Sequence, residues 1–213
     1  LHVSRQGDLW VGTRGQGVSR INLAQGVNEK FRHYSEQVNS LSANGITDIF
    51  EDTAGQIWIA AYGGGVNLYQ DGGFTHLRHK EKNNNSLSSD RVLKIYQTDD
   101  GLMWFGTEGG GISSYHQGNF KHYRHDPQKS ESLSSDMAWS IVEDRQGDLW
   151  IGTWGGGLNR WRKTDRDAGI EKFIHYGKKQ GILSSVIYDI VPDEQGLLWL
   201  STNKGLIRID PLT

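Results

Sequence analysis

Five residues of different chemical type occupy one repeated place in the sequence. Each lies four residues after the tryptophan of a recurring segment, and they are Arg14, Tyr62, Glu108, Trp154 and Asn203. The positions around them repeat, whereas this one differs every time. Together these side chains offer donors, acceptors and ring faces, which suit a small polar ligand with apolar faces, such as a sugar. A second interpretation is that these exposed loop positions vary because nothing constrains them.

A second set of candidate ligand-binding residues precedes the first strand of three units. Asp90, Arg91 and Asp136 belong to it, and Asn44 and Ser185 take the same place in two other units. These side chains are placed to line the same mouth. However, asparagine and aspartate also end turns by accepting hydrogen bonds from nearby backbone N–H groups, and we favour this turn role.

The elements that must position these residues are repeats centred on a tryptophan. The segments GDLWVGT, GQIWIAA, GLMWFGT, GDLWIGT and GLLWLST place tryptophans at 10, 58, 104, 150 and 199, so that successive positions differ by 48, 46, 46 and 49 residues. This period is typical of propeller blades. Inside each unit, short two-residue alternation broken by glycine and asparagine indicates strands rather than helices. The sequence therefore predicts an all-β propeller of about five four-stranded antiparallel blades.

The unit that begins at Ile46 shows the four strands most clearly. They read ITDIFED, IWIAA, VNLYQ and FTHLRH, and the last two are joined by Asp71-Gly72-Gly73, a strong hairpin signal. A four-stranded sheet that is apolar on both faces has to stack against its neighbours. We expect the repeated tryptophan to lie between stacked blades.

The whole chain, residues 1–213, is predicted to be a single propeller region. The units cover residues 1–43 with a partial first strand, 44–90, 91–136, 137–184, and 185–213 without an outer strand. The chain starts without methionine and inside a unit. We therefore expect it to be part of a larger propeller.

Composition disfavours several classes of function. Lys and Arg number 23 against 25 Asp and Glu, so the net charge of −2 gives no attraction to nucleic acid. There is no cysteine, which removes thiolate catalysis and cysteine metal sites. No stretch reaches the roughly 20 apolar residues of a membrane span, so we expect no membrane contact by this region.

Catalysis, cofactors and metals are not predicted either. The outer-strand segments FRHY, FTHL, FKHY and FIHY place His33, His76, His122 and His175 one to a blade, where they cannot converge on a metal. Among the variable loop positions only Glu108 is a conventional base, and no serine stands in a nucleophile elbow. We expect a binding module rather than an enzyme, with a protein-interaction scaffold as the alternative and a propeller lyase or hydrolase as a less favoured one.

The repeated pattern resembles the two-component regulator propeller repeat. Residues 141–160, IVEDRQGDLWIGTWGGGLNR, match it almost position for position, and FxHY and SLSSD recur with it. The resemblance implies seven-bladed propellers in the periplasmic sensor of an inner-membrane receptor. It also implies a homodimeric receptor that senses a small polar ligand or carbohydrate, with a histidine kinase or diguanylate cyclase as output. The segment Ala60-Ala61-Tyr62 and the shortened loop at STNKGL depart from the pattern.

Overall fold

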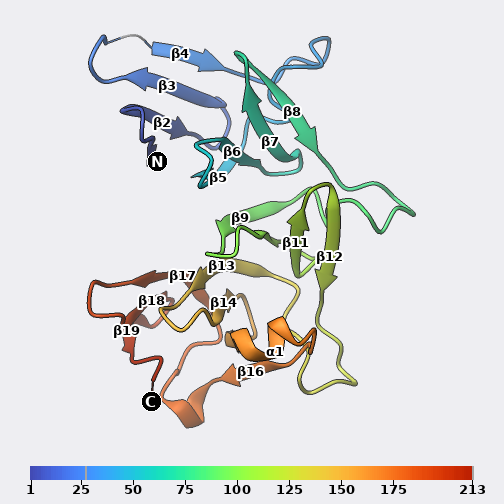
Figure 1. Cartoon of the computed structure of the whole chain (residues 1–213), viewed down its shortest axis with the longest axis vertical. Helices are drawn as coiled ribbons and strands as arrows, with labels where there is room; N and C mark the ends of the chain where they lie inside the picture. The colour runs from blue at the N-terminus through green and yellow to red at the C-terminus, as the bar shows by residue number, and fades with distance from the viewer. Residues whose placement is uncertain (27, 213) are drawn as a thin grey trace.

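The computed structural model describes residues 1–26 and 28–212 and consists of five antiparallel sheets. Figure 1 shows that the sheets follow one another in an arc, in chain order, with the first strand of each sheet towards the centre and the last towards the periphery. Each sheet is a meander of hydrogen-bonded neighbours. The predicted all-β propeller architecture is confirmed, and we refer to the sheets as blades 1 to 5.

The strand bounds follow the repeat. Blade 1 contains β1 (His2–Val3), β2 (Asp8–Gly12), β3 (Val18–Asn22) and β4 (Asn28–Phe31). Blade 2 contains β5 (Ile46–Glu51), β6 (Ile57–Ala61), β7 (Gly65–Gln70) and β8 (Gly73–Leu77). Blade 3 contains β9 (Val92–Gln97), β10 (Met103–Thr107), β11 (Ile112–His116) and β12 (Asn119–Tyr123).

Blade 4 carries the helical insertion of the chain. It contains β13 (Ala138–Glu143), β14 (Leu149–Thr153), β15 (Gly157–Trp161), the short helix α1 (Lys163–Asp167) and β16 (Phe173–Tyr176). A 3-10 turn, η1 (Lys178–Gln180), leads to blade 5, which contains β17 (Ile187–Pro192), β18 (Leu198–Thr202) and β19 (Gly205–Ile209). In the second blade the hairpin at Asp71 and Gly72 has φ of 48° and 81°, as the predicted two-residue turn requires.

In blades 2, 4 and 5 the first turn is built around an aspartate that also anchors the repeated tryptophan. In blade 2, Asp52 Oδ1 accepts the N–H groups of Ala54 and Gln56, and Asp52 Oδ2 accepts Trp58 Nε1 at 2.8 Å. Asp144 and Asp193 repeat this arrangement, and Thr98 replaces the carboxylate in blade 3. One short side chain thus fixes both the turn and the indole.

The anchored tryptophans pack between blades, as predicted. Trp58 contacts Phe105 of blade 3 with ring centroids 6.0 Å apart, and Trp104 contacts Trp161 of blade 4 at 5.9 Å in an edge-on arrangement. Trp104 is 0% exposed. Trp199, in blade 5, is partly exposed. Burial of the repeated tryptophan of a blade therefore depends on packing against the blade that follows it.

The face opposite the glycine loops links neighbouring blades through the last residue of the innermost strand. Glu51 Oε2 accepts the N–H of Arg5, Gln97 Oε1 accepts that of Thr53, and Glu143 Oε2 accepts that of Asp99. Pro192 takes the equivalent place in blade 5, where Arg145 Nη2 donates to the carbonyl of Glu194 instead. These bonds hold each blade to the next one.

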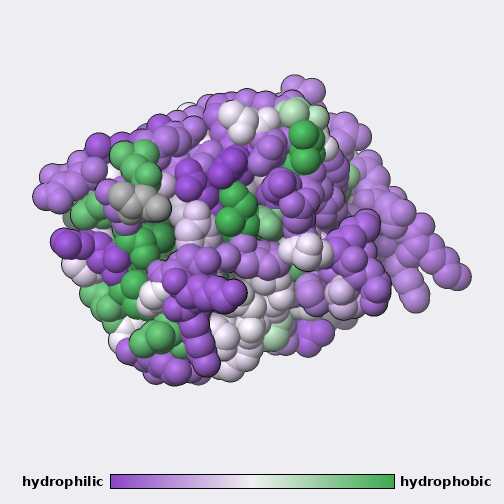
Figure 2. All heavy atoms as spheres, turned by 90° about the horizontal axis from the view of Figure 1, so that it is seen from below, coloured by the Kyte–Doolittle hydropathy of each residue, from purple (hydrophilic) through white to green (hydrophobic). Residues whose placement is uncertain are grey.

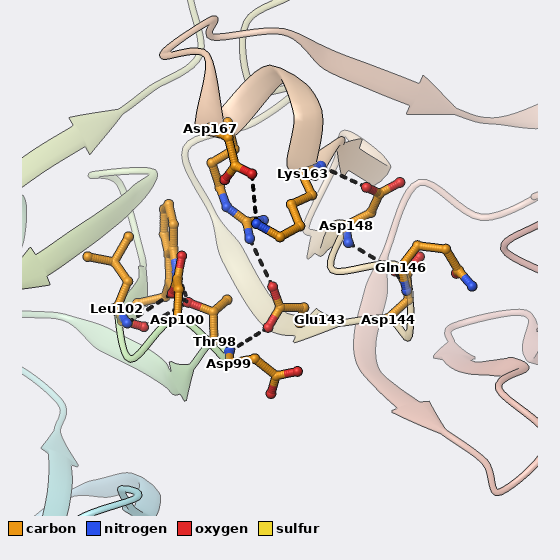
Figure 3. Close-up of polar contacts among 12 residues, drawn as sticks. Thr98, Asp99, Asp100, Leu102, Glu143, Asp144, Gln146, Asp148, Lys163 and Asp167 are labelled. Atoms are coloured by element: carbon orange, nitrogen blue, oxygen red, sulfur yellow. Dashed lines mark hydrogen bonds and ion pairs between the residues drawn. The ribbon is translucent and has the colours of Figure 1, made fainter.

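Helix α1 reinforces the link between blades 3 and 4 with a buried ion pair. Arg166 Nη2 lies 2.8 Å from Glu143 Oε1, and the two side chains are 6% and 5% exposed. Figure 3 shows Glu143 between the Asp99 turn and this helix, while Asp148 receives the N–H of Lys163 beside it. Within the described part of the chain, Arg166 Nε and Nη1 are buried without hydrogen-bond partners. The pair is therefore only partly satisfied.

The outer-strand histidines are structural, but one of them was aligned wrongly. His76, His122 and His175 bond backbone carbonyls of the preceding crossing. The sequence equates His33 with them, whereas His33 Nδ1 bonds the Leu41 carbonyl, as His79 and His125 do in their own units. The similar letters FRHY and FKHY lie three residues out of register, because Phe31 pairs with Val18 where Tyr123 pairs with Ile112.

Blade 5 leaves apolar side chains uncovered. Val191, Leu206 and Leu212 are each more than half exposed. Figure 2, seen from below, shows hydrophobic patches towards one side of a largely hydrophilic surface. The core of the chain consequently lies between successive blades rather than on the free face of the last one.

Candidate functional site

The innermost strands enclose a cavity of about 870 Å³ at the centre of the arc. Side chains from all five blades line it, from the loops after β2, β6 and β10 and from the innermost strands β5, β9, β13 and β17. This placement follows from the fold, because the first strand of every blade faces the common centre (Figure 1). The cavity is large enough for a small-molecule ligand.

Three of the five variable loop residues line this cavity, namely Arg14, Tyr62 and Glu108. Trp154 contacts two of the aromatic side chains in the lining. Asn203 does not belong to it: its Oδ1 accepts Ser184 Oγ at 2.6 Å, and it borders a smaller hollow of about 360 Å³ beside the blade 4 glycine loop. The loop positions therefore divide between two hollows.

Tyr62, Glu108 and Arg91 form one polar network across blades 2 and 3. The Tyr62 hydroxyl donates to Glu108 Oε2 at 2.6 Å, and Arg91 Nη1 lies 3.1 Å from Glu108 Oε1. The hydrogen bond to the carboxylate raises the pKa of the Tyr62 phenol above its ordinary value. Glu108 is thus paired on both oxygens and presents little free charge to the cavity.

The opposite side of the cavity is aromatic. Trp139, Trp154 and Tyr188 contact one another, with ring centroids 5.4 to 6.0 Å apart. Trp154 is 42% exposed and Tyr188 37% exposed, so this aromatic platform presents ring surface to solvent. Trp139 Nε1 is buried and has no hydrogen-bond partner among the described residues. Exposed indole and phenol faces are suited to stack against the ring of a ligand.

The cavity is also lined by charged side chains of the innermost strands, which follow the loop residues towards its interior. Asp48, Lys94 and Asp189 stand at equivalent register positions, opposite Ala60, Gly106 and Ser201. Lys94 Nζ is 3.7 Å from Asp48 Oδ2. Burial raises the pKa of the Asp48 carboxyl, Lys94 and two backbone N–H groups oppose this, and the negative charge of Asp189 adds to it. The deep part of the cavity is therefore polar and charged.

The crossing residues Asp90 and Asp136 hold the loops in place. Asp90 Oδ1 accepts the N–H of His79, and its carbonyl accepts the N–H groups of Gly63 and Gly65. Asp136 makes the same three bonds in the next unit. These contacts agree with the turn role. Arg91, the third crossing candidate, instead enters the network with Glu108.

The candidate residues predicted from the sequence do not include the residues of the innermost strands that face the cavity. In β5, β13 and β17 the register shifts by one residue, which leaves Thr47, Trp139 and Tyr188 unpaired at a bulge, and all three line the cavity. A bulge re-aims a side chain in this way. The signal was present: the two residues before the repeated isoleucine read TD, LK, WS and YD and differ in every blade.

Neither a metal site nor a membrane span is found in the part of the chain that the structure describes. No three His, Asp or Glu side chains in residues 1–26 and 28–212 are grouped to hold a metal ion. Over the same residues, no helix has the length and apolar character needed to cross a bilayer.

Four segments of the chain match the family described as "two component regulator propeller". They are residues 40–63, 86–109, 132–155 and 181–204, and each contains a crossing, an innermost strand and a glycine loop. No curated protein matches the chain.

Solved structures share the fold at low sequence identity. The extracellular domain of a hybrid two-component system from B. thetaiotaomicron is 23% identical, with a TM-score of 0.78 over 98% of this chain and 26% of that one. A second such domain from the same organism is 22% identical, with a TM-score of 0.66 over 100% of this chain and 36% of that one. Virginiamycin B lyase from Staphylococcus aureus is 14% identical, with a TM-score of 0.67 over 100% of this chain and 69% of that one. The chain therefore spans 26% and 36% of the length of these two extracellular domains.

Proposed function

We propose that this chain, which is built from two-component regulator propeller repeats, is a non-catalytic sensor module that binds a small polar ligand in its central cavity. Support comes from the repeats and from the likeness to extracellular domains of hybrid two-component systems. By the same likeness we place the module on the extracytoplasmic side of a membrane receptor, and we propose, from the resemblance of the repeat alone, that this receptor acts as a homodimer. A carbohydrate is the ligand class that we expect first.

The observation that carries this proposal is the contrast between the two halves of the cavity. One half is lined by Tyr62 and Glu108, whose hydrogen-bonding network Arg91 completes. The other half is lined by the exposed ring of Tyr188, against which the exposed ring of Trp154 packs. A ligand with a ring face and several hydroxyl groups complements both halves. Such a ligand moves a receptor equilibrium only if it prefers one arrangement of the blades or protomers.

A thermal-shift screen of this chain against mono- and oligosaccharides tests the proposal. A binding sugar raises the unfolding temperature of the wild-type chain. The variants Trp154→Ala and Tyr62→Ala should lose that rise, because each removes one side of the site. Both side chains are 42% exposed, so the variants should keep the unfolding temperature of the free wild-type chain within a few degrees.

The matched control is Tyr34→Ala, which removes an aromatic side chain that is 52% exposed and does not line the cavity. This variant should respond to sugar as the wild type does. Two results would count against the proposal: an unchanged response in both site variants, or no response of the wild type to any member of the panel.

A further inference from the structure

The smaller hollow, of about 360 Å³, lies over the glycine loop of blade 4 and is called the blade 4 hollow below. Its lining includes the three glycines 155–157 and part of the segment that leads from β16 to blade 5, namely Tyr176, Gly177, Lys178, Ile182 and Ser185. None of the described residues that line the central cavity belongs to this lining. The two hollows are therefore separate places on the same face of the blades.

In the first three blades an arginine occupies the place of this hollow. The last paired residues of the outer strands are Phe31, Leu77, Tyr123 and Tyr176. The residue that follows is Arg32, Arg78, Arg124 and, in blade 4, Gly177. Arg78 Nη2 donates to the carbonyl of Gly63 at 3.2 Å and lies 3.4 Å from Asp90 Oδ2. The arginine of blade 2 thus closes over the glycine loop of its own blade.

Blade 4 has lost both members of this pair. A Cβ atom at Gly177 would meet no heavy atom within 4 Å. Ser185 takes the place of Asp90, since its carbonyl accepts the N–H groups of Gly155 and Gly157. The Ser185 side chain is exposed, and its hydroxyl has no hydrogen-bond partner in residues 1–26 and 28–212. No side chain of the same residues donates to the Gly155 carbonyl, the counterpart of the acceptor in blade 2.

These open groups result from the sequence inside the chain. Both partners of the Asp90 carboxylate, the Arg78 guanidinium and the His79 N–H, come from the segment that follows the outer strand of the preceding blade. The chain contains the corresponding segment before Ser185, where glycine replaces the arginine. That segment is also shorter, because its buried aliphatic residue follows the outer strand by six positions in blade 4 and by ten in blade 3.

The loop that begins with Trp154 joins the blade 4 hollow to the central cavity. The Trp154 ring contacts Trp139 and Tyr188, which line the cavity, and the next residue, Gly155, lines the hollow. A Cβ atom at Gly155 would meet nothing within 4 Å, so no side chain of the described residues stands in the way there. Trp154 is 42% exposed, and its ring surface is open to a molecule that crosses from one hollow to the other.

We propose that the blade 4 hollow binds a second ring of a saccharide whose first ring occupies the central cavity. The Ser185 hydroxyl, the Gly155 carbonyl and the Lys178 ammonium group hydrogen-bond to the hydroxyl groups of the second ring. Tyr176 and Ile182 supply apolar surface in the same lining. This inference rests on the proposed function and narrows it from any small polar ligand to an oligosaccharide of at least two rings.

Isothermal titration calorimetry with saccharides of increasing length tests this inference. The probes are glucose with cellobiose and cellotriose, glucose with maltose and maltotriose, and xylose with xylobiose and xylotriose. In at least one series the wild-type chain should bind the disaccharide or trisaccharide about tenfold more tightly than the monosaccharide. One or two additional hydrogen bonds at a second ring supply a ratio of this size.

The variant Gly177→Arg restores the arginine of the other blades and fills the blade 4 hollow. It should bind the monosaccharide as the wild type does and lose the preference for the longer sugars. Gly177→Ala is the matched control, because its Cβ atom leaves the hollow open, and it should keep the wild-type preference. Both variants should unfold within a few degrees of the wild-type temperature, since neither side chain meets a clash.

Failure of this inference is distinguishable from failure of the proposed function. Equal affinity of the wild type for all members of each series overturns the second ring site and leaves a cavity that binds one ring. No binding of any probe also overturns it, while the broader sugar panel still decides the proposed function. A preference that survives in Gly177→Arg, or one that is lost equally in Gly177→Ala, excludes the blade 4 hollow as its source.

Discussion

Replacing Arg166 by methionine removes the positive half of the buried pair that joins helix α1 to Glu143 at the end of β13. The Glu143 carboxylate then keeps one donor, the N–H of Asp99 at 2.7 Å, and stays 5% exposed or close to it. The buried Glu143 carboxylate, once it has lost its cation, can become neutral by binding a proton. With an ordinary glutamate pKa of about 4.3, protonation near pH 7 costs about 3.7 kcal/mol, which is an upper limit on the loss of stability.

The expected loss lies below that limit. Burial raises the pKa of Glu143 in the wild-type chain, although the Asp99 N–H and Arg166 oppose this, so part of the cost is already present before the substitution. Two guanidinium nitrogens of Arg166 also lack hydrogen-bond partners among the described residues, and methionine brings no such groups into the interior. We expect Arg166→Met to lower the free energy of unfolding by about 2–3 kcal/mol near pH 7.

The pH dependence gives the sharper test. A carboxyl group with a raised folded-state pKa favours the folded state at low pH, and this contribution is lost as pH rises through the folded-state pKa. Because removal of Arg166 raises that pKa further, the variant loses most relative to the wild type near pH 7. Near pH 5 the cost of protonation falls to about 1 kcal/mol, and the difference between the two chains should shrink to that size.

Urea unfolding followed by tryptophan fluorescence at both pH values measures these differences. The double variant Glu143→Gln with Arg166→Met should regain most of the stability near pH 7, because the glutamine oxygen still accepts the Asp99 N–H and no charge is buried. Equal stability of Arg166→Met and wild type near pH 7 would refute this account of the pair. So would a loss of the same size at both pH values.

Two further outcomes are expected. Trp104→Ala should lower the free energy of unfolding by about 3–5 kcal/mol, because Trp104 is fully buried between blades. Trp199→Ala should lower it clearly less, because Trp199 is partly exposed. Urea denaturation that gives equal losses for the two variants would contradict this dependence on the next blade. Glu108→Gln should lower the pKa of Tyr62 towards its ordinary value, since the carboxylate that accepts its proton is removed; ultraviolet titration, with Tyr62→Phe to identify the signal, should show this shift, and an unmoved titration would argue against the 2.6 Å contact.

The fold could be predicted from the sequence because its determinants are local and repeat. The tryptophan spacing set the number of blades, and Asp71-Gly72 predicted a hairpin that the positive φ values confirm. The role of Asp52 and Asp144 as acceptors for the indole N–H of a tryptophan six residues later needed the structure, because it depends on how the second strand returns beside the turn.

The candidate site was predicted only in part, since the sequence does not show which residues of a strand escape pairing. Strict alternation assigns one of any two neighbouring residues to each face of the sheet. At the bulge in β13, Ala138 pairs with Thr153 and Ser140 pairs with the next residue, Gly152. Trp139 therefore has no partner residue on β14, and its side chain lines the cavity. The loop residues were easier to find, because no pairing rule obscures them.

The two ends of the innermost strands differ in whether their side chains are satisfied within the chain. At the end away from the glycine loops, Glu51, Gln97 and Glu143 each accept an N–H from the preceding blade, so a changed residue there leaves a neighbour unpaired. At the bulges the side chains differ in type and in their partners: Thr47 Oγ1 donates to the carbonyls of Ala60 and Val92, whereas Trp139 Nε1 has no hydrogen-bond partner among the described residues, and both residues line the cavity. Hydrogen bonds between blades therefore constrain residue type more uniformly at one end of the innermost strands than at the other. Under the proposed function, ligand specificity lies with the bulged positions and their neighbours, and the loops beside them have a supporting part.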